Sequence, residues 1–396
     1  MRYRADLGVT LPQELRKDFL SKLWYVSDAI EALSLDDERL DLVTFDLRTP
    51  DDALAGSVAT RITDVARRML AGYRPLERRV VLDRTASAPS SGEDPHAALA
   101  ASGDLHLFGR GRAGIGPLLA RLLDLLGADL RRLGDDLHTA PHRFPTLIGA
   151  DTLARCRYFE AFPHALTIAS HLREDLDAIA AFARDAKVEQ GRLVTDPHAL
   201  APSECLLSPA VCFHLYAWLA GSKLEGTTLA RAEGKCFRYE SGALEGLARL
   251  WDFTMSEFVA VGTQPEALAF RERGMARAQT LFDDWGLAYE IHTATDPFFV
   301  DAFAKQAVFQ AAFELKFEAS AVLPYRGDGL AISSFNYHQD FFGRSFEISD
   351  AAGKPAHTAC VAFGVERFAL AFIAQHGRDP RRWPARIRQL YAEAGA

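Results

Sequence analysis

Residues 357–370 read HTACVAFGVERFAL, in which a small polar stretch runs through Gly-Val-Glu-Arg into an apolar helix. Arg367 stands at the opening of that helix. Moving an arginine out of water costs free energy unless a fixed anion meets the guanidinium, and arginine suits phosphate and carboxylate oxygens because its fork binds them in pairs. The stretch therefore predicts that Arg367 meets an anion, whereas Glu366 could merely cap the first helical turn.

A second charged pair lies upstream, in GKCFRYE at residues 234–240. Arg238 and Glu240 are two residues apart on an expected strand, so they share one face of it. Such a pair is either an ordinary ion pair or part of a site.

Composition restricts the class of protein. The chain has 396 residues, of which 48% are hydrophobic and 25% charged, as is typical of globular enzymes with two domains or one large one. The formal charge of −8 argues against a broad nucleic-acid footprint, although the basic stretch at residues 377–388 could form a local anion-binding face instead of a solvated helix.

The expected compartment decides how the five cysteines are interpreted. No apolar leader opens the sequence and no run approaches about 18 apolar residues, so we expect a cytoplasmic protein that neither crosses nor binds a membrane. Reduced thiols then act as buried fillers, nucleophiles or metal ligands. The sequence contains no C-x-x-C, which disfavours a structural zinc clip.

Patterning along the chain predicts an α+β protein. Residues 1–85 alternate strand-like runs (41–47, 78–83) with amphipathic helices (13–33, 54–73), which indicates a small α/β appendage of unknown role. An Ala/Ser/Pro/Gly-rich linker is expected at 86–103. The aromatic-rich alternation beyond about residue 140 favours an antiparallel sheet flanked by helices, within a catalytic domain spanning 104–396.

A formal G-x-G-x-x-G at Gly109, Gly111 and Gly114 suggests a dinucleotide site. The next strand of a βαβ unit is missing, because the following segment is polar and broken by prolines. A turn before a helix that starts near Pro117 is the better interpretation.

Taken together, a helix, a strand with F-R-x-E, a second strand and a distant G-x-E-R helix resemble motifs 1, 2 and 3 of class II aminoacyl-tRNA synthetases. The resemblance implies three catalytic residues: Arg238 on the α-phosphate of ATP, Glu240 beside the adenine, and Arg367 on the γ-phosphate. The anion expected at Arg367 would then be a triphosphate with its Mg²⁺.

The stretch ISSFNYHQDFFGRSF (332–346) followed by HTACVAFGVERFALAF is similar to the pattern of seryl-tRNA synthetases. Two positions depart from it, since Ala331 replaces a Glu and Phe342 a Gln, and no long heptad arm precedes the core. The chain more closely resembles amino acid:[carrier protein] ligases, truncated seryl-synthetase homologues without a tRNA domain. Seven stretches carry this resemblance over about residues 140–376: LSPAVCFHLY, GKCFRYE, FTMSEFVAVGT, TDPFF, ELKFE, SSFNYHQDFFG and HTACVAFGVERFALA.

The resemblance also implies a catalytic zinc held by Cys212, Glu257 and Cys360, with one open position for a substrate amine. His214 and His357 are alternative ligands because they lie near the two cysteines in sequence. Residues that resemble the family's substrate pocket are Glu314, Lys316, Ser334 and Asn336. Their other interpretation is a surface ion pair and turn residues, and Cys156, Cys205 and Cys236 are taken as fillers.

The expected function is therefore ATP-dependent activation of a small amino acid, glycine or alanine by resemblance, and its transfer to the phosphopantetheine thiol of a carrier protein. We expect a homodimer, because motif 1 serves the subunit interface in this fold, and no tRNA partner. Residues 297–313 could form an amphipathic helix that docks the carrier protein, or could simply pack in the core. The alternatives are a seryl-like tRNA synthetase and a catalytically idle paralogue that binds a nucleotide or amino acid.

Overall fold

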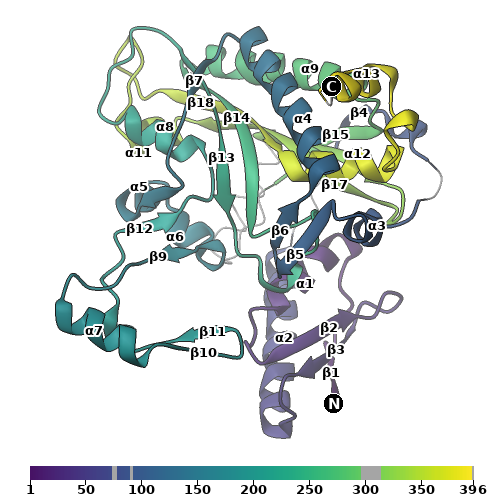
Figure 1. Cartoon of the computed structure of the whole chain (residues 1–396), viewed down its shortest axis with the longest axis vertical. Coiled ribbons are helices and arrows are strands. Elements are labelled where there is room, and N and C mark those ends of the chain that lie inside the picture. Colours follow the sequence, from purple (N-terminus) through teal and green to yellow (C-terminus); the bar gives the residue numbers. More distant parts are fainter. Residues whose placement is uncertain (74–77, 90–91, 296–313, 395–396) are drawn as a thin grey trace.

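The computed structural model describes residues 1–73, 78–89, 92–295 and 314–394. Figure 1 shows a large sheet with helices on both faces, a small N-terminal unit at one end, and an arm that projects away from the body. The expected α+β class, with a mainly antiparallel sheet flanked by helices, is confirmed. The helix expected at 297–313 lies outside the described residues.

The large sheet has eight strands in the order β4-β15-β16-β17-β18-β14-β13-β7. Neighbouring strands run antiparallel, except that β13 and β7 are parallel. The strands are β4 (Val80–Asp83), β15 (Tyr289–Thr293), β16 (Lys316–Leu323), β17 (Asp328–Gln339), β18 (His357–Gly364), β14 (Asp252–Gly262), β13 (Thr228–Phe237) and β7 (Ala140–His142).

Apolar side chains on the two faces of this sheet form two separate cores. Helices α4 (Pro117–Asp136), α9 (Gln264–Asp284) and α12 (Val365–His376) cover one face, and α5 (Ala150–Arg155), α8 (Cys212–Trp218) and α11 (Phe341–Ser345) cover the other. Successive side chains of a strand point to opposite faces, so Phe258 packs in the first core and Val259 in the second. Cys360 belongs to the second core, on the α8 side.

The N-terminal unit has its own three-stranded sheet and its own apolar core. Strands β1 (Arg2–Asp6), β3 (Leu42–Leu47) and β2 (Ile30–Leu35) pack against α1 (Arg16–Leu23) and α2 (Asp52–Gly72). A single helix over residues 13–33 was the wrong expectation. The helix ends at Leu23, because residues from Ile30 onward pair with β3 as a strand.

Two elements connect the expected appendage and linker to the body. Strand β4 pairs with β15 in the large sheet, and residues 95–101 of the expected linker form helix α3 (Pro95–Ala101). The division into an appendage (1–85), a linker and a catalytic domain stays a prediction.

The G-x-G-x-x-G segment forms a hairpin of β5 (Leu105–Gly109) and β6 (Arg112–Ile115), with Arg110 and Gly111 at its turn. Helix α4 then begins at Pro117, as expected. A hairpin is not the strand-turn-helix that holds a dinucleotide pyrophosphate.

The arm consists of α7 (Leu176–Asp185), β10 (Lys187–Glu189) and β11 (Arg192–Val194), and extends beyond a small sheet of β8 (Leu147–Gly149), β12 (Cys205–Leu207) and β9 (Ile168–Ala169) (Figure 1). The remaining helices are α6 (Tyr158–Ala161) and α13 (Ala385–Glu393). Short 3-10 turns occur at Gln13–Leu15, Thr85–Ser87, Pro163–Ala165, Pro197–Ala199, Ser241–Ala243 and Pro380–Arg382.

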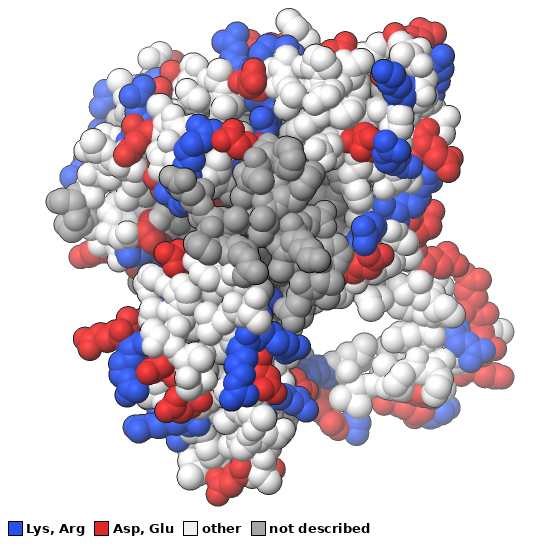
Figure 2. All heavy atoms as spheres, turned by 180° about the vertical axis from the view of Figure 1, so that it is seen from behind, with Lys and Arg blue, Asp and Glu red and all other residues white. Residues whose placement is uncertain are grey.

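Helices long and apolar enough to cross a membrane are absent from the described ranges. Basic and acidic side chains are interspersed over the face shown in Figure 2.

Candidate active site

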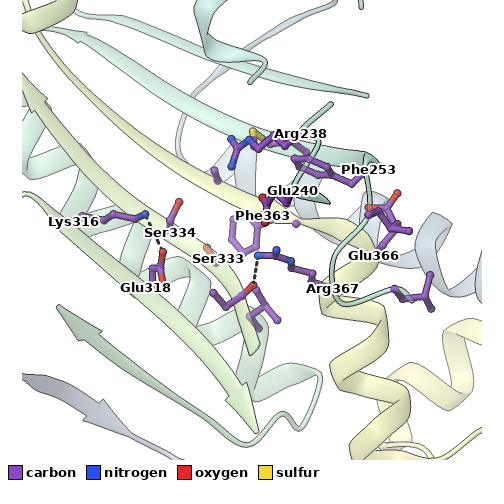
Figure 3. Close-up of a pocket in the computed structure, with 17 residues that line it drawn as sticks. Arg238, Glu240, Phe253, Lys316, Glu318, Ser333, Ser334, Phe363, Glu366 and Arg367 are labelled. Carbon is purple, nitrogen blue, oxygen red and sulfur yellow. Dashed lines mark hydrogen bonds and ion pairs between the residues drawn. The ribbon is translucent and has the colours of Figure 1, made fainter. Parts of the chain in front are cut away.

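A cavity of about 130 Å³ opens between the end of β13, the strands β14, β16, β17 and β18, and the start of α12. Its charged lining residues are Arg238, Glu240, Lys316, Glu318, Glu366 and Arg367. Figure 3 shows Arg238 and Arg367 approaching this cavity from different elements, one beyond β13 and one from α12. The fold therefore brings the two arginines that the sequence analysis singled out into one pocket.

Arg367 lies in the first turn of α12 and extends into the pocket. Its Nε donates to the Ala248 carbonyl at 2.8 Å and its Nη1 to the Ala331 carbonyl at 3.4 Å. The pKa of Arg367 is lowered to about 10, chiefly by burial and then by the nearby charges of Arg249 and Arg238, while Glu240 opposes them. A positive charge is thus held where neighbouring positive charges disfavour it, which is how a site for a polyanion is built.

Arg238 and Glu240 follow β13 directly, since the strand ends at Phe237. The Arg238 Nε donates to the Pro209 carbonyl at 2.9 Å, and its guanidinium lies 5.5 Å from the centre of the Phe253 ring. Glu240 forms an ion pair of 2.8 Å with Arg249. The two predicted residues therefore share the pocket, while the ion pair of Glu240 is made with a third residue.

Glu366 precedes Arg367, and one interpretation of the sequence was that it merely caps the first turn of the helix. Its carboxylate instead accepts hydrogen bonds from the backbone N–H of Thr254 at 2.8 and 3.0 Å and from the Thr254 hydroxyl at 2.7 Å. Because Thr254 lies on β14, these bonds tie the start of α12 to the sheet and fix the direction from which Arg367 enters the pocket.

The expected substrate residues separate into two groups. Lys316 and Ser334 line the pocket, and Lys316 pairs with Glu318 at 2.9 Å, a partner that the sequence interpretation did not name (Figure 3). The hydroxyl of Ser333, also in the lining, is buried and has no hydrogen-bond partner among the described residues. A buried donor of that kind is costly in an empty pocket and fits one that receives a polar ligand.

Glu314 and Asn336 are not among the described residues that line this pocket. Glu314 has a positive φ of 49° and pairs with Arg79, so it turns away from the strand that places Lys316. Asn336 donates from its side-chain amide to Ser334 Oγ at 3.2 Å and to Cys360 Sγ at 3.4 Å. Asn336 thus connects a pocket residue with one of the expected metal ligands.

The three expected zinc ligands come together from α8, β14 and β18. The backbone N–H of Cys212 donates to Glu257 Oε2 at 3.0 Å, and the thiols of Cys212 and Cys360 both hydrogen-bond the same carboxylate. All three side chains are buried. Burial raises the pKa of Glu257 against the lowering effect of these bonds, and burial followed by the nearby Glu257 charge raises the pKa of Cys212 well above its usual value.

The cluster therefore forms, although no three His, Cys, Asp or Glu side chains in the described ranges are spaced as a metal-ion site. Two thiols and one carboxylate are a donor set that suits Zn²⁺. Ala362 adjoins the cluster, since it is the register partner of both Glu257 and Ser334 and also lines the pocket. The cluster and the pocket are thus neighbouring parts of one region.

The structure places neither alternative histidine with the cluster. His214 Nε2 lies 3.1 Å from the Leu147 carbonyl with its ring stacked on Phe144, and His357 Nδ1 lies 2.6 Å from the Tyr337 hydroxyl. His338, which the sequence interpretation missed, has its Nε2 3.7 Å from Cys360 Sγ. Its two-residue spacing from Asn336 on β17 was the available signal, because such residues share a strand face.

Comparison with solved structures supports the synthetase-like fold. M. kandleri SerRS, in its crystal structure with A. aeolicus tRNASec, matches with a TM-score of 0.72 and 20% identity over 99% of this chain and 78% of that one. The cytoplasmic serine-tRNA ligase of Naegleria fowleri with AMP gives a TM-score of 0.62 and 12% identity, covering 86% of this chain and 71% of that one. At these identities the likeness shows the fold: class II seryl-tRNA synthetase-like.

Sequence comparison identifies the family. No family model matches the chain. A type-2 serine–tRNA ligase of Methanopyrus kandleri is 26% identical over 298 residues, which cover 70% of this chain and 56% of that protein. Amino acid–[acyl-carrier-protein] ligase 2 of Bradyrhizobium diazoefficiens is 38% identical over 260 residues, which cover 64% of this chain and 75% of that protein, and ligase 1 of the same organism is also 38% identical. The chain therefore belongs to the amino acid–[acyl-carrier-protein] ligases.

Proposed function

We propose that this enzyme activates a small amino acid with ATP and transfers the aminoacyl group to the phosphopantetheine thiol of a carrier protein. The observation that carries the proposal is the pocket in which Arg238 and Arg367 meet, next to the cluster of Cys212, Glu257 and Cys360. The pocket supplies cationic donors for a triphosphate, and the cluster supplies a place for an amine.

Activation needs no protein nucleophile. A carboxylate oxygen of the amino acid attacks the α-phosphorus of ATP, an O–P bond forms, and pyrophosphate leaves with the electron pair. We assign Arg238 to the α-phosphate, Glu240 to the adenine side and Arg367 to the γ-phosphate, with Mg²⁺ accompanying the triphosphate. Fixed positive charge then meets the negative charge that accumulates in the transition state.

Transfer consumes the adenylate. The carrier thiol loses its proton and attacks the acyl carbon, the C–S bond forms, and AMP leaves as the mixed anhydride breaks. Lys316, Ser334 and Asn336 are proposed as substrate-binding residues, because the first two line the pocket and the third connects Ser334 with Cys360. Glu314 faces Arg79, and its predicted role stays a prediction.

We further propose that Cys212, Glu257 and Cys360 hold one zinc ion. Two thiols and one carboxyl group that are buried in mutual contact favour a divalent cation, because its charge offsets the cost of ionising the three groups together. When bound, the metal would supply an electrophilic position that accepts an unprotonated amine, and so would select an α-amino acid. Glycine or alanine is proposed as the substrate from the family resemblance.

The carrier protein is favoured over tRNA as the acceptor. The chain covers 75% of the ligase from B. diazoefficiens but 56% of the serine–tRNA ligase from M. kandleri. The net charge of −8 provides no general attraction for a long polyanion. The expected basic face near the C-terminus is partly occupied, since Arg381 pairs with Asp379 and Arg386 pairs with the buried Asp129.

We propose that two copies associate along the β7 edge of the large sheet. Among the strands that the structure describes, β7 stands at the end of the order, so one of its edges has no described neighbour in that sheet. Trp218 is 69% exposed beside it, with its ring 5.9 Å from His142 on β7 and 6.3 Å from Phe144. An exposed aromatic group at a sheet edge is typical of a subunit interface.

Amino-acid-dependent pyrophosphate exchange across all twenty amino acids tests the activation step. We expect exchange with glycine or alanine and none without amino acid. A parent protein that binds ATP but exchanges with none of the twenty would instead identify the idle paralogue.

A further inference from the structure

The segment at residues 238–251, here called the motif 2 loop, joins β13 to β14 and carries Arg238, Glu240 and Arg249. Over most of its length it has no sheet partner among the described residues, so contacts from other parts of the chain must fix its shape. Those contacts come from the N-terminal unit, from the β5–β6 hairpin, from α3 and α12, and also from Ala165, Thr167 and Arg326, which bond Tyr239, Trp251 and Glu245 of the loop.

The N-terminal unit reaches the loop through the turn that follows α1. The hydroxyl of Tyr25 donates to the carbonyl of Tyr239 at 3.2 Å. Tyr239 lies between the two pocket residues Arg238 and Glu240, so this bond holds the backbone that directs both side chains. The Tyr25 ring also lies edge-on against His164, with 5.2 Å between ring centres.

Trp24 covers the next part of the loop. A Cβ atom added at Gly242 would overlap the Trp24 indole, so the ring lies directly on the loop backbone there. On the hairpin side, the Arg110 guanidinium lies 5.6 Å from the centre of the same ring. The indole is thus held between the hairpin turn and the motif 2 loop, and Figure 1 shows α1 beside the tip of that hairpin.

The hairpin turn and α3 hold the rest of the loop. The Gly111 carbonyl accepts from the Trp251 N–H at 2.9 Å, and an added Cβ at Gly111 would lie 2.7 Å from that nitrogen, so only glycine permits this approach. His96 of α3 accepts from the Leu247 N–H at 2.9 Å. Arg367, assigned above to the γ-phosphate, donates to the Ala248 carbonyl of the loop. The position of this side chain and the shape of the loop therefore depend on each other.

We propose that Trp24 and Tyr25 are positioning residues for ATP: the N-terminal unit holds the first half of the motif 2 loop so that Arg238 and Glu240 face the pocket. The inference rests on the proposed function for what these two residues bind. It gives residues 1–73 a role in the reaction although none of them lines the pocket. If the contacts of Trp24 and Tyr25 with the loop strengthen ATP binding by some factor, thermodynamic linkage requires that bound ATP strengthens those contacts by the same factor.

The test uses the full chain and two independent readouts. Hydrogen–deuterium exchange of peptides covering 239–250 reports loop order, and pyrophosphate exchange gives separate KM values for ATP and for the amino acid. The variants are Trp24→Ala, Trp24→Phe and Tyr25→Phe. Tyr3→Phe is the matched control, because its hydroxyl accepts from the Asp51 N–H within the N-terminal unit, away from the loop.

We expect Tyr25→Phe to raise the KM for ATP up to about fivefold, which corresponds to one lost hydrogen bond. Trp24→Ala should raise it about tenfold through the lost ring contacts, Trp24→Phe should restore most of the loss, and the KM for the amino acid should stay within about twofold. Deuterium uptake at 239–250 should rise in Tyr25→Phe and in Trp24→Ala. In the parent, ATP should slow uptake around residues 24–25.

Unchanged uptake at 239–250 in Trp24→Ala, or a rise in the KM for ATP no larger than in Tyr3→Phe, would overturn the proposal. Should Trp24→Ala fail to fold, Tyr25→Phe decides alone, because it removes a single hydroxyl. A parent without pyrophosphate exchange would reject the proposed function, while the uptake data would still decide whether the N-terminal unit orders the loop.

Discussion

Replacing Arg367 by Met separates a catalytic role from a structural one. The pKa of Arg367 falls from its usual value to about 10, chiefly through burial and then through Arg249. At ~1.36 kcal/mol per pKa unit, the charged side chain costs the folded, ligand-free protein about 3 kcal/mol. The sign follows from the direction: a base whose folded pKa lies below its unfolded pKa destabilises the fold at every pH below the folded value.

Arg367→Met removes that cost but leaves the carbonyls of Ala248 and Ala331 without their donor, at about 1 kcal/mol each. The two effects nearly cancel. We therefore expect the free energy of unfolding to stay within about 2 kcal/mol of the parent value, while pyrophosphate exchange falls by ~10²-fold or more because the γ-phosphate loses its charged donor.

Chemical denaturation and pyrophosphate exchange on the same preparations measure both quantities. Arg344→Met is the matched control, since Arg344 is 67% exposed and pairs with Asp340 outside the pocket. It should exchange at close to the parental rate. Exchange retained by Arg367→Met, or a variant destabilised by several kcal/mol, would show that Arg367 serves the fold and not the phosphate.

Three further predictions concern the metal, the helix start and the interface. The parent should contain about one zinc per chain and Cys212→Ser with Cys360→Ser should contain almost none; metal analysis finding no zinc in the parent, or undiminished zinc in the variant, contradicts the assignment. Glu366→Gln should lower the free energy of unfolding by about 1–3 kcal/mol, because an amide replaces a carboxylate that accepts from Thr254; a denaturation midpoint equal to the parent's would count against this role. Trp218→Glu should convert a dimer into a monomer in sedimentation analysis, whereas Phe108→Glu, at an equally exposed aromatic elsewhere, should not; a parent that sediments as a monomer refutes the interface.

The arginines and the cluster were predictable because motif order and residue type encode them. Arg238, Arg367, Lys316 and Ser334 all reach one pocket. Strand periodicity could have excluded His357, which is three residues from Cys360 on β18 and so faces the other side of the sheet. Glu314 was predicted as a substrate residue, but its positive φ turns the chain just before β16 begins, and it is not among the described lining residues; local pattern does not reveal such a turn.

Contacts between distant segments were beyond the reach of local pattern. The hydrogen bond from Tyr25 to Tyr239 spans 214 positions, and the sequence around neither residue predicts it. The same holds for Glu366, whose acceptor role depends on Thr254 being brought beside it by the antiparallel pairing of β14 with β18. The pattern within 13–33 also favoured one long helix, and only pairing with β3 shows that its end is a strand.

The identity of the acceptor tests the central claim most directly. The purified protein is incubated with ATP, its preferred amino acid, a phosphopantetheinylated carrier protein and total tRNA. The carrier protein is then weighed by mass spectrometry, and the tRNA is resolved on acid gels. The account predicts a carrier protein heavier by one aminoacyl group, held as a thioester that hydroxylamine removes, and uncharged tRNA. Charged tRNA beside an unmodified cognate carrier protein would contradict it.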